Sequence, residues 1–339
     1  MKFTQSFRIK AFAVAVLLFI IFFLTRNIVH IEYWPLTLKP FEYGSGNATL
    51  GFQEILVVAP REAPEQLHWR KDGLLRAAAY TGLRVEIPRQ PIWTDVDTEI
   101  LMAKNKEMKK GYALSWLGHL NALKVAATRN TSLILEDDAD WDIEIREQMP
   151  AIAEAIRNLT GYPSEVQVAE SMVQDPPYGT GWDVLWLGHC GDSIVFDPPP
   201  IVLIDPTVPP YINSWEKVVA PDPQQKRYIH WSAGPICTYA YAITGHAARN
   251  ILERDDHGTQ AYDIWLHIMC KGRELRCVTV NPELFHHHEA AGVKETLNSG
   301  LASGESNEKE FTDNIWHSAR CNSASDGDQL VTCMGKEPK

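Results

Sequence analysis

The sequence has little positive charge, no cysteine pair of the kind that binds zinc and no internal repeat. Its 32 Lys and Arg face 43 Asp and Glu, which gives a formal net charge of -11, and no basic stripe occurs along it. This charge argues against nucleic acid as a partner. The six cysteines show no C-x-x-C spacing, so no zinc site is predicted. What remains is the composition of a globular protein with 45% hydrophobic residues, whose 11 Trp need a substantial core or a binding cleft.

A long apolar segment is also missing. Residues 11–24 form an unbroken apolar run of 14 residues, which as a helix spans ~21 Å, short of the ~30 Å hydrocarbon core of a bilayer. Ile28, Val29 and the long side chain of Arg26 can extend the run, and no small-residue cleavage site follows it. The basic residues that precede it, and that keep the N-terminus cytosolic, are Lys2, Arg8 and Lys10. We therefore predict a cytosolic tail over 1–10, a signal-anchor transmembrane helix over 11–29 and a stem over 30–52, with the remaining chain in the lumen of the Golgi or endoplasmic reticulum.

Sequons and cysteines agree with a lumenal compartment. Three N-glycosylation sequons begin at Asn47, Asn130 and Asn158. An even number of cysteines permits disulfides in an oxidising compartment, and six cysteines allow 15 connectivities. The local pairings that we favour are Cys270 with Cys277 and Cys321 with Cys333.

Strand and helix patterns alternate in the first half of the chain. The segments expected are a strand over 55–59, a helix over 73–81, a strand over 84–87, a helix over 115–128 that Ser115 caps, and a strand that ends at Glu136. This alternation predicts an α/β fold with a mainly parallel sheet flanked by helices. Residues 196–235 are rich in proline and aromatic residues without periodicity, so we expect an ordered lid there.

The strand that ends at Glu136 is followed by an acidic cluster. Glu136, Asp137, Asp138 and Asp140 place four carboxylates within five residues, and such a cluster is unfavourable unless something positive lies among its members. Ligands of open α/β sheets bind beyond the carboxyl ends of the strands. The cluster therefore indicates a site for a divalent cation that holds the diphosphate of a nucleotide. The alternative is a solvated acidic turn.

Two other segments provide groups for the same kind of site. The loop after the first strand carries basic residues suited to a nucleotide, among them Arg70, together with Asp72. Far downstream, three consecutive histidines over 286–288 offer imidazoles. Carboxylate and imidazole donors together suit Mn²⁺ better than Mg²⁺, although Mg²⁺ is possible. The alternative for the histidines is a surface run.

Several strings of the sequence resemble glycosyltransferase family 25, the family of lipopolysaccharide and procollagen sugar transferases. The likeness is closest to its fungal membrane-anchored branch and covers roughly residues 52–322, in order. It is carried by residues 116–123 (WLGHLNAL), 133–142 (LILEDDADWD), 183–190 (DVLWLGHC), 237–243 (CTYAYAI) and 314–320 (NIWHSAR). The resemblance implies a catalytic domain over 53–322 with an A-type glycosyltransferase fold, followed by a C-terminal tail over 323–339. It also implies a UDP-sugar donor, usually Mn²⁺, and inversion at the anomeric carbon.

The resemblance also assigns roles to single residues. Asp138 is expected on the metal, together with His287 or His288. Glu136 or Asp137 is expected towards the donor ribose. The donor-binding residues further include Arg70, Asp72 and His119, although a histidine within a helix is more often structural.

The general base is placed on Asp263 by family position, with an ordinary aspartate at a helix N-terminus as the alternative. Two positions depart from the family pattern. Residues 60–64 (PREAP) differ from its arginine-rich loop, and Gly118 stands where the family usually has Ser before His119. Both departures concern the loop and helix that face the donor.

These observations predict a metal-dependent, inverting glycosyltransferase that moves galactose or glucose from a UDP-sugar to a glycan or glycoprotein acceptor. Two other classes stay open: a lumenal metal-dependent hydrolase that uses the same acids and histidines, and a non-catalytic binding protein on the same fold. Metal-dependent binding of UDP separates the transferase from the hydrolase, which has no need of the nucleotide.

Overall fold

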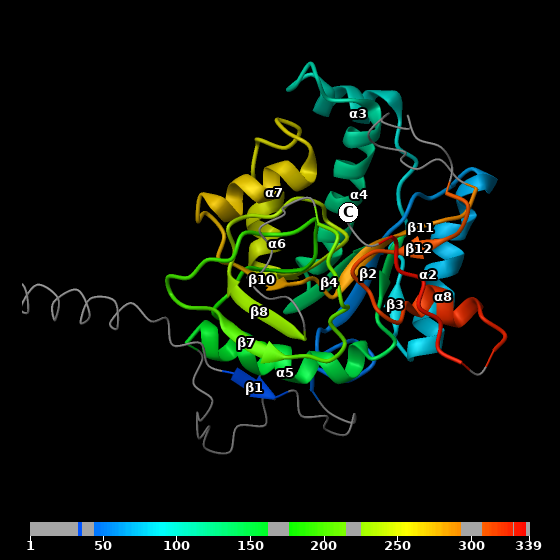
Figure 1. Ribbon diagram of the computed structural model, residues 1–339. Coiled ribbons are helices and arrows are strands. Elements are labelled where there is room, and N and C mark those ends of the chain that lie inside the picture. Colours follow the sequence, from blue (N-terminus) through cyan, green and yellow to red (C-terminus); the bar gives the residue numbers. More distant parts are fainter. Residues whose placement is uncertain are drawn as a thin grey trace, which may run out of the picture. The chain divides into compact units, whose positions relative to one another are not determined.

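A nine-stranded mixed sheet carries the fold (Figure 1). The computed structural model describes residues 33–35, 44–161, 176–214, 225–292, 307–327 and 329–336. The order of the strands is β1-β7-β8-β10-β6-β9-β4-β2-β3. Their bounds are β1 Tyr33–Pro35, β2 Glu54–Val58, β3 Val85–Glu86, β4 Thr131–Glu136, β6 Val184–Gly188, β7 Ile201–Ile204, β8 Lys226–Trp231, β9 Ala240–Thr244 and β10 Cys277–Asn281.

The mixed sheet corrects the prediction that the sheet is mainly parallel. β2 pairs in parallel with both β3 and β4, as strand–helix alternation predicts. β9, however, lies between β4 and β6 and is antiparallel to both. The reason lies in residues 196–235, which hold the antiparallel pair β7 and β8 of the main sheet where we predicted a lid. No helix separates β7, β8 and β9 among the described residues. The chain reverses direction between β7 and β8, and β9 keeps the direction of β8, which makes it antiparallel to β6.

The prediction of a transmembrane helix is also corrected. No helix among the residues that the structure describes is long and apolar enough to cross a membrane. The predicted anchor over 11–29 lies outside the described residues, and its apolar run is shorter than a hydrocarbon core. The fold class of the described residues is therefore α/β with a mixed sheet.

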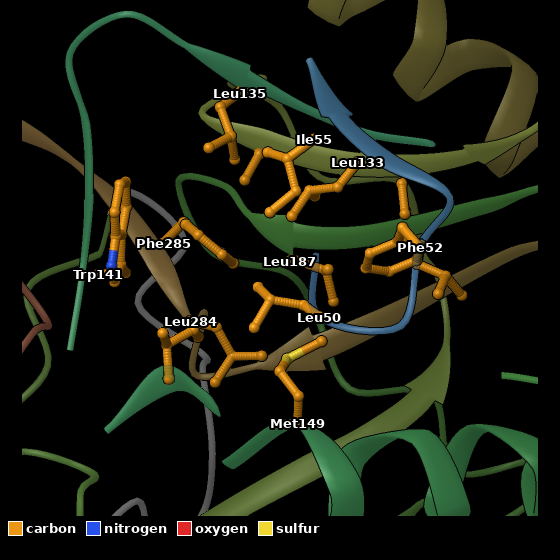
Figure 2. Packing of buried hydrophobic residues seen from close by; sticks show 14 of the residues in the cluster. Leu50, Phe52, Ile55, Leu133, Leu135, Trp141, Met149, Leu187, Leu284 and Phe285 are labelled. Carbon is orange, nitrogen blue, oxygen red and sulfur yellow. The ribbon is translucent and has the colours of Figure 1, made fainter. Parts of the chain in front are cut away.

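Hydrophobic side chains cover both faces of the sheet because successive strand residues point to opposite sides. In β4, Leu133 and Leu135 belong to one buried cluster, which includes Met149 of α5, and part of it is seen in Figure 2. Ile134 belongs to the other cluster, with Trp116 of α4. The helices are η1 Glu65–Leu67, α2 His68–Thr81, α3 Asp95–Met102, α4 Lys110–Ala126, α5 Ile145–Leu159, α6 Gly245–Leu252, α7 Tyr262–Lys271 and α8 Ala319–Ala324.

A second, three-stranded sheet brings the three histidines to the acidic cluster. It has the order β12-β11-β5, with bounds β5 Ala139–Trp141, β11 Phe285–Glu289 and β12 Phe311–Thr312. His286 pairs with Asp140 and His287 pairs with Ala139 across β11 and β5. His286 and His288 are buried, so the histidines form an inner strand and not a surface run.

Three disulfides link the six cysteines. Two of them, Cys270–Cys277 and Cys321–Cys333, confirm the predicted local pairings. The third joins Cys190, after β6, to Cys237, before β9. Disulfides persist in oxidising compartments, so they indicate a location outside the cytosol.

A buried carboxylate, Asp142, joins the start of α5 to the segment before α8. Its Oδ1 accepts a hydrogen bond from the backbone N–H of Glu144 at 3.0 Å, and its Oδ2 accepts one from His317 at 2.9 Å. Burial nevertheless raises the pKa of Asp142 from 3.8 to about 7.

We expect Asp142 to make the protein less stable as pH rises from about 4 to about 7. The folded state holds the proton more tightly than the unfolded state across that range, so the free energy of unfolding falls as the proton is lost. Asp142→Asn removes this titration. The stability of the wild type minus that of the variant should therefore fall by ~2 kcal/mol between pH 5 and pH 8, measured by urea unfolding. Parallel stability curves for the two proteins would contradict the raised pKa.

Candidate functional site

The acid loop, which we define as Glu136, Asp137 and Asp138, lies at the carboxyl end of β4. β4 is parallel to β2, and Glu136 lies in register with Val58, the last residue of β2. Both strands therefore end at the same edge of the sheet, where ligands bind in folds of this class. Figure 1 shows the two strands next to each other.

Arg320 of α8 contacts the backbone of the acid loop. Its side chain is 2% exposed and donates to the carbonyl oxygens of Asp137 at 2.7 Å and Ala139 at 2.9 Å. Burial lowers the pKa of Arg320 to about 10, although Asp140 and the other nearby carboxylates act to raise it. α2 makes room for this guanidinium at Gly73, where a Cβ atom would lie 2.5 Å from Arg320 Nη1.

Asp140 is a structural member of the acidic cluster. It is fully buried, and its Oδ2 accepts hydrogen bonds from Thr312 Oγ1 at 2.6 Å and from the hydroxyl of Ser318. Its Oδ1 accepts from the backbone N–H of Arg320 at 3.0 Å. These bonds tie β5, β12 and α8 together and leave the acid loop to face the cavity.

Arg70, in the first turn of α2, contacts the carboxylates of the acid loop. Its Nε lies 2.7 Å from Asp137 Oδ1, and its Nη2 lies 2.7 Å from Asp138 Oδ2. The other oxygen of Asp138, Oδ1, is buried and makes no hydrogen bond to any described residue. The guanidinium of Arg70 thus neutralises only part of the charge of the three carboxylates of the acid loop. Burial, opposed by Arg70 and increased by repulsion from Asp138, raises the pKa of Asp137 to about 6.

Glu136 is held at the base of the acid loop by neighbouring side chains. Thr238 Oγ1 donates to Glu136 Oε1 at 2.7 Å, and His119 Nε2 lies 3.6 Å from the same oxygen. Burial acts to raise the pKa of Glu136, but His119 and Thr238 outweigh it, so the pKa is lowered. His119 is itself fixed by Tyr241, whose hydroxyl lies 3.1 Å from Nδ1, and by stacking on Tyr262 with ring centroids 4.1 Å apart. His119 therefore lines the cavity and also has a structural role.

The two histidines predicted as metal ligands lie in different surroundings. His287 lines the cavity, with its ring centroid 4.7 Å from that of Tyr239 and its Nε2 2.8 Å from Glu289 Oε1. His288 is turned away, with Nδ1 2.9 Å from Thr312 Oγ1 and Nε2 3.4 Å from Glu310 Oε2. Of the two, only His287 presents its ring to the cavity; His288 contacts the acid loop through its backbone N–H, which donates to the carbonyl oxygen of Asp138 at 2.9 Å.

The cavity in front of the acid loop has a volume of about 700 Å³, within the range of small-molecule sites. Its charged lining residues are those of the acid loop, Arg70, Arg61, Glu62 and Lys110, and His287 lies among them. The remaining wall is largely apolar and comes from the ends of β2, the segment before α3 and the face of α4: Val58, Pro91, Ile92, Trp93, Leu114 and Gly118. A smaller cavity of about 260 Å³ shares Asp137 and is lined by Arg61, His68 and Lys71. The site therefore joins anionic, cationic and apolar surfaces.

Besides His288, two predicted site residues lie outside the lining of this cavity. Asp72 is exposed on α2. Asp263, in the first turn of α7, accepts hydrogen bonds from the backbone N–H groups of Cys237 at 3.2 Å and Ile264 at 2.9 Å. Burial raises the pKa of Asp263, against the effect of those two bonds. These contacts correspond to the alternative of an aspartate at a helix N-terminus, which here also supports the loop before β9.

Sequence reasoning missed three residues of the site. Tyr239 and Arg320 lie within the strings of the resemblance, so the signal was present without an assigned role. Gln90, which lines the cavity, lies in an irregular segment between β3 and α3 that carries no motif.

A divalent cation fits the acid loop only with help from a ligand. In the described parts of the chain, no group of three or more His, Cys, Asp or Glu could hold a metal ion by itself. Mn²⁺ and Mg²⁺ at nucleotide sites, however, are held by one or two carboxylates, with phosphate oxygens and water completing the shell. Asp138 Oδ1, which is buried without a hydrogen bond, is a donor of that kind.

Comparison with known proteins adds no assignment. The chain matches no model of a known protein family and no curated protein.

Proposed function

We propose that this protein is a metal-dependent glycosyltransferase that moves a hexose from a UDP-sugar to a glycan or glycoprotein acceptor in the lumen of the secretory pathway. The observation that carries the proposal is Asp138, whose buried Oδ1 makes no hydrogen bond to any residue that the structure describes and which lies in an acid loop that lines the cavity. The sequence resemblance to glycosyltransferase family 25 supports the same activity.

The charges of the site favour a cation together with a diphosphate. The four carboxylates of the acidic cluster outnumber the guanidinium groups of Arg70 and Arg320, and a divalent cation would offset the remaining negative charge. An anionic ligand would then be held by the cation and by the basic residues next to Asp137, which are Arg61, His68 and Lys71. A diphosphate offers oxygens to both partners.

In the proposed reaction, the residues of the cavity have different roles. Asp138 would hold the cation, with His287 as the nearby imidazole. The bound cation would neutralise the charge that develops on the leaving diphosphate. Thr238 and His119 keep Glu136 in place, Arg70 orients Asp137 and Asp138, and the apolar wall excludes water from the nucleoside.

UDP titration of the folded protein tests this proposal. With Mn²⁺ present, calorimetry should show UDP binding that EDTA weakens by ~100-fold, because the cation bridges the acid loop and the diphosphate. Transfer or slow hydrolysis of UDP-galactose or UDP-glucose should then follow. Binding of UDP that is equally tight with EDTA would argue against the cation. A protein that binds UDP with Mn²⁺ but turns over no UDP-sugar would be a binding protein, and a hydrolase would act without affinity for UDP.

A further inference from the structure

The apolar part of the cavity contains one buried amide, that of Gln90. Its side chain is 4% exposed and lines the cavity. Its Nε2 donates to the carbonyl oxygen of Gly118 at 3.4 Å, whereas its Oε1 is buried and makes no hydrogen bond to any described residue. Buried polar atoms in native proteins nearly always have a partner, so this oxygen points to a ligand.

The orientation of the amide follows from its neighbour. The Gly118 carbonyl can only accept a hydrogen bond, so the NH₂ group of Gln90 must face it and Oε1 must face the other way. Gln90 lines the cavity, so Oε1 is the acceptor that its amide leaves for a ligand. The second N–H of Nε2 adds a donor beside it.

The surroundings of Gln90 form a narrow apolar slot. Gly118 has no side chain, and a Cβ atom there would lie 2.9 Å from Val58 Cγ1 and 3.8 Å from Gln90 Nε2. Ile92 and Trp93 also line the cavity, and Ile92 is 69% exposed. A planar ring would cover these groups and reach Gln90 with its edge.

We propose that Gln90 is the residue that selects the base of the nucleotide donor, by accepting a hydrogen bond from the ring N–H of uracil. This inference rests on the proposed function and concerns the apolar part of the same cavity. Uracil carries an N–H at position 3 between two carbonyl oxygens, which matches an acceptor beside a donor. Cytosine carries a bare nitrogen at that position, which would face Gln90 Oε1 as a second acceptor. Cytosine could pair with this amide only by shifting its amino group onto Oε1, so the preference for uracil requires that the base is held in one position, which the comparison of UDP with CDP tests.

The test uses binding of UDP and CDP to the Mn²⁺-loaded full chain and to Gln90→Met, which keeps the length of the side chain without its hydrogen bonds. We expect UDP to bind the wild type ~10- to 100-fold more tightly than CDP, and the substitution to remove that preference by weakening UDP alone. Equal weakening of both nucleotides, with a lowered melting temperature, would show a purely structural role for Gln90. A variant that keeps its preference for UDP would likewise overturn the inference.

Two further ligands keep the result interpretable. N3-methyl-UDP lacks the ring N–H, so the wild type should bind it ~10- to 100-fold more weakly than UDP even if the variant does not fold. Equal affinity for the two would refute the role of Gln90. Pyrophosphate with Mn²⁺ tests the acid loop alone: if it binds while UDP and CDP are not distinguished, the base assignment fails and the proposed function stands. If neither pyrophosphate nor UDP binds, the proposed function itself fails, and the inference fails with it.

Discussion

Asp138→Asn is expected to lower the rate of sugar transfer by ~100- to 1,000-fold while the protein remains folded. Asp138 provides the buried oxygen without a hydrogen bond that faces the proposed cation. The charge that this cation neutralises develops mainly in the transition state, so turnover should suffer more than substrate binding. The fold should survive because Arg70 keeps its contact with Asp137, 2.7 Å away.

The solvated acidic turn predicts a different result for the same substitution. In such a turn, Asp138→Asn would only relieve repulsion between neighbouring carboxylates and raise stability slightly. Mn²⁺-dependent UDP affinity, transfer rate and melting temperature of the variant separate the two cases. Asp255→Asn, the same change at an exposed aspartate, is the matched control and should leave all three unchanged. Wild-type activity and UDP affinity in Asp138→Asn would refute the proposed metal site.

Local pattern predicted the strands of the site well, because buried strands are marked by continuous apolar runs. The strand that ends at Glu136 was placed correctly, since four apolar and small residues lead into charged ones. The start of α2 was not predicted correctly. We expected the helix from Gly73, but α2 begins at His68, and Gly73 lies inside it because the guanidinium of Arg320 packs against that position. A contact between residues so far apart leaves no local signal.

The same reason explains the errors in the second half of the chain. His286 and His288 are polar, so the sequence alone favoured neither a strand nor burial, yet pairing of β11 with β5 and β12 places both in a buried inner strand. β7 and β8 are short strands within a proline-rich segment, and only their pairing with each other and with β10 makes them part of the main sheet. The sequence pattern therefore identified the acid loop, while long-range strand pairing determined which histidine ring faces the cavity.

Arg320→Met is expected to destabilise the protein by ~3–5 kcal/mol and to disorder the acid loop. The substitution leaves the carbonyl oxygens of Asp137 and Ala139 without their donor. It also leaves the buried carboxylate of Asp140 without its cationic neighbour. Arg320→Lys should recover only part of the loss, because a single ammonium cannot replace the planar, forked guanidinium. Urea unfolding measures the loss of stability.

Arg227 provides the matched control for Arg320, because it is an equally buried arginine away from the cavity. Its side chain is 3% exposed, lies 2.6 Å from Asp205 Oδ2 and donates to the carbonyl oxygens of Pro282 and Glu283. Arg227→Met should therefore lose stability to a similar degree, but its folded fraction should bind UDP with Mn²⁺ as the wild type does. The folded fraction of Arg320→Met should not, because Arg320 holds the backbone of the acid loop in addition to stabilising the fold. Equal UDP binding by the two variants, at matched folded fraction, would show that Arg320 contributes to stability alone.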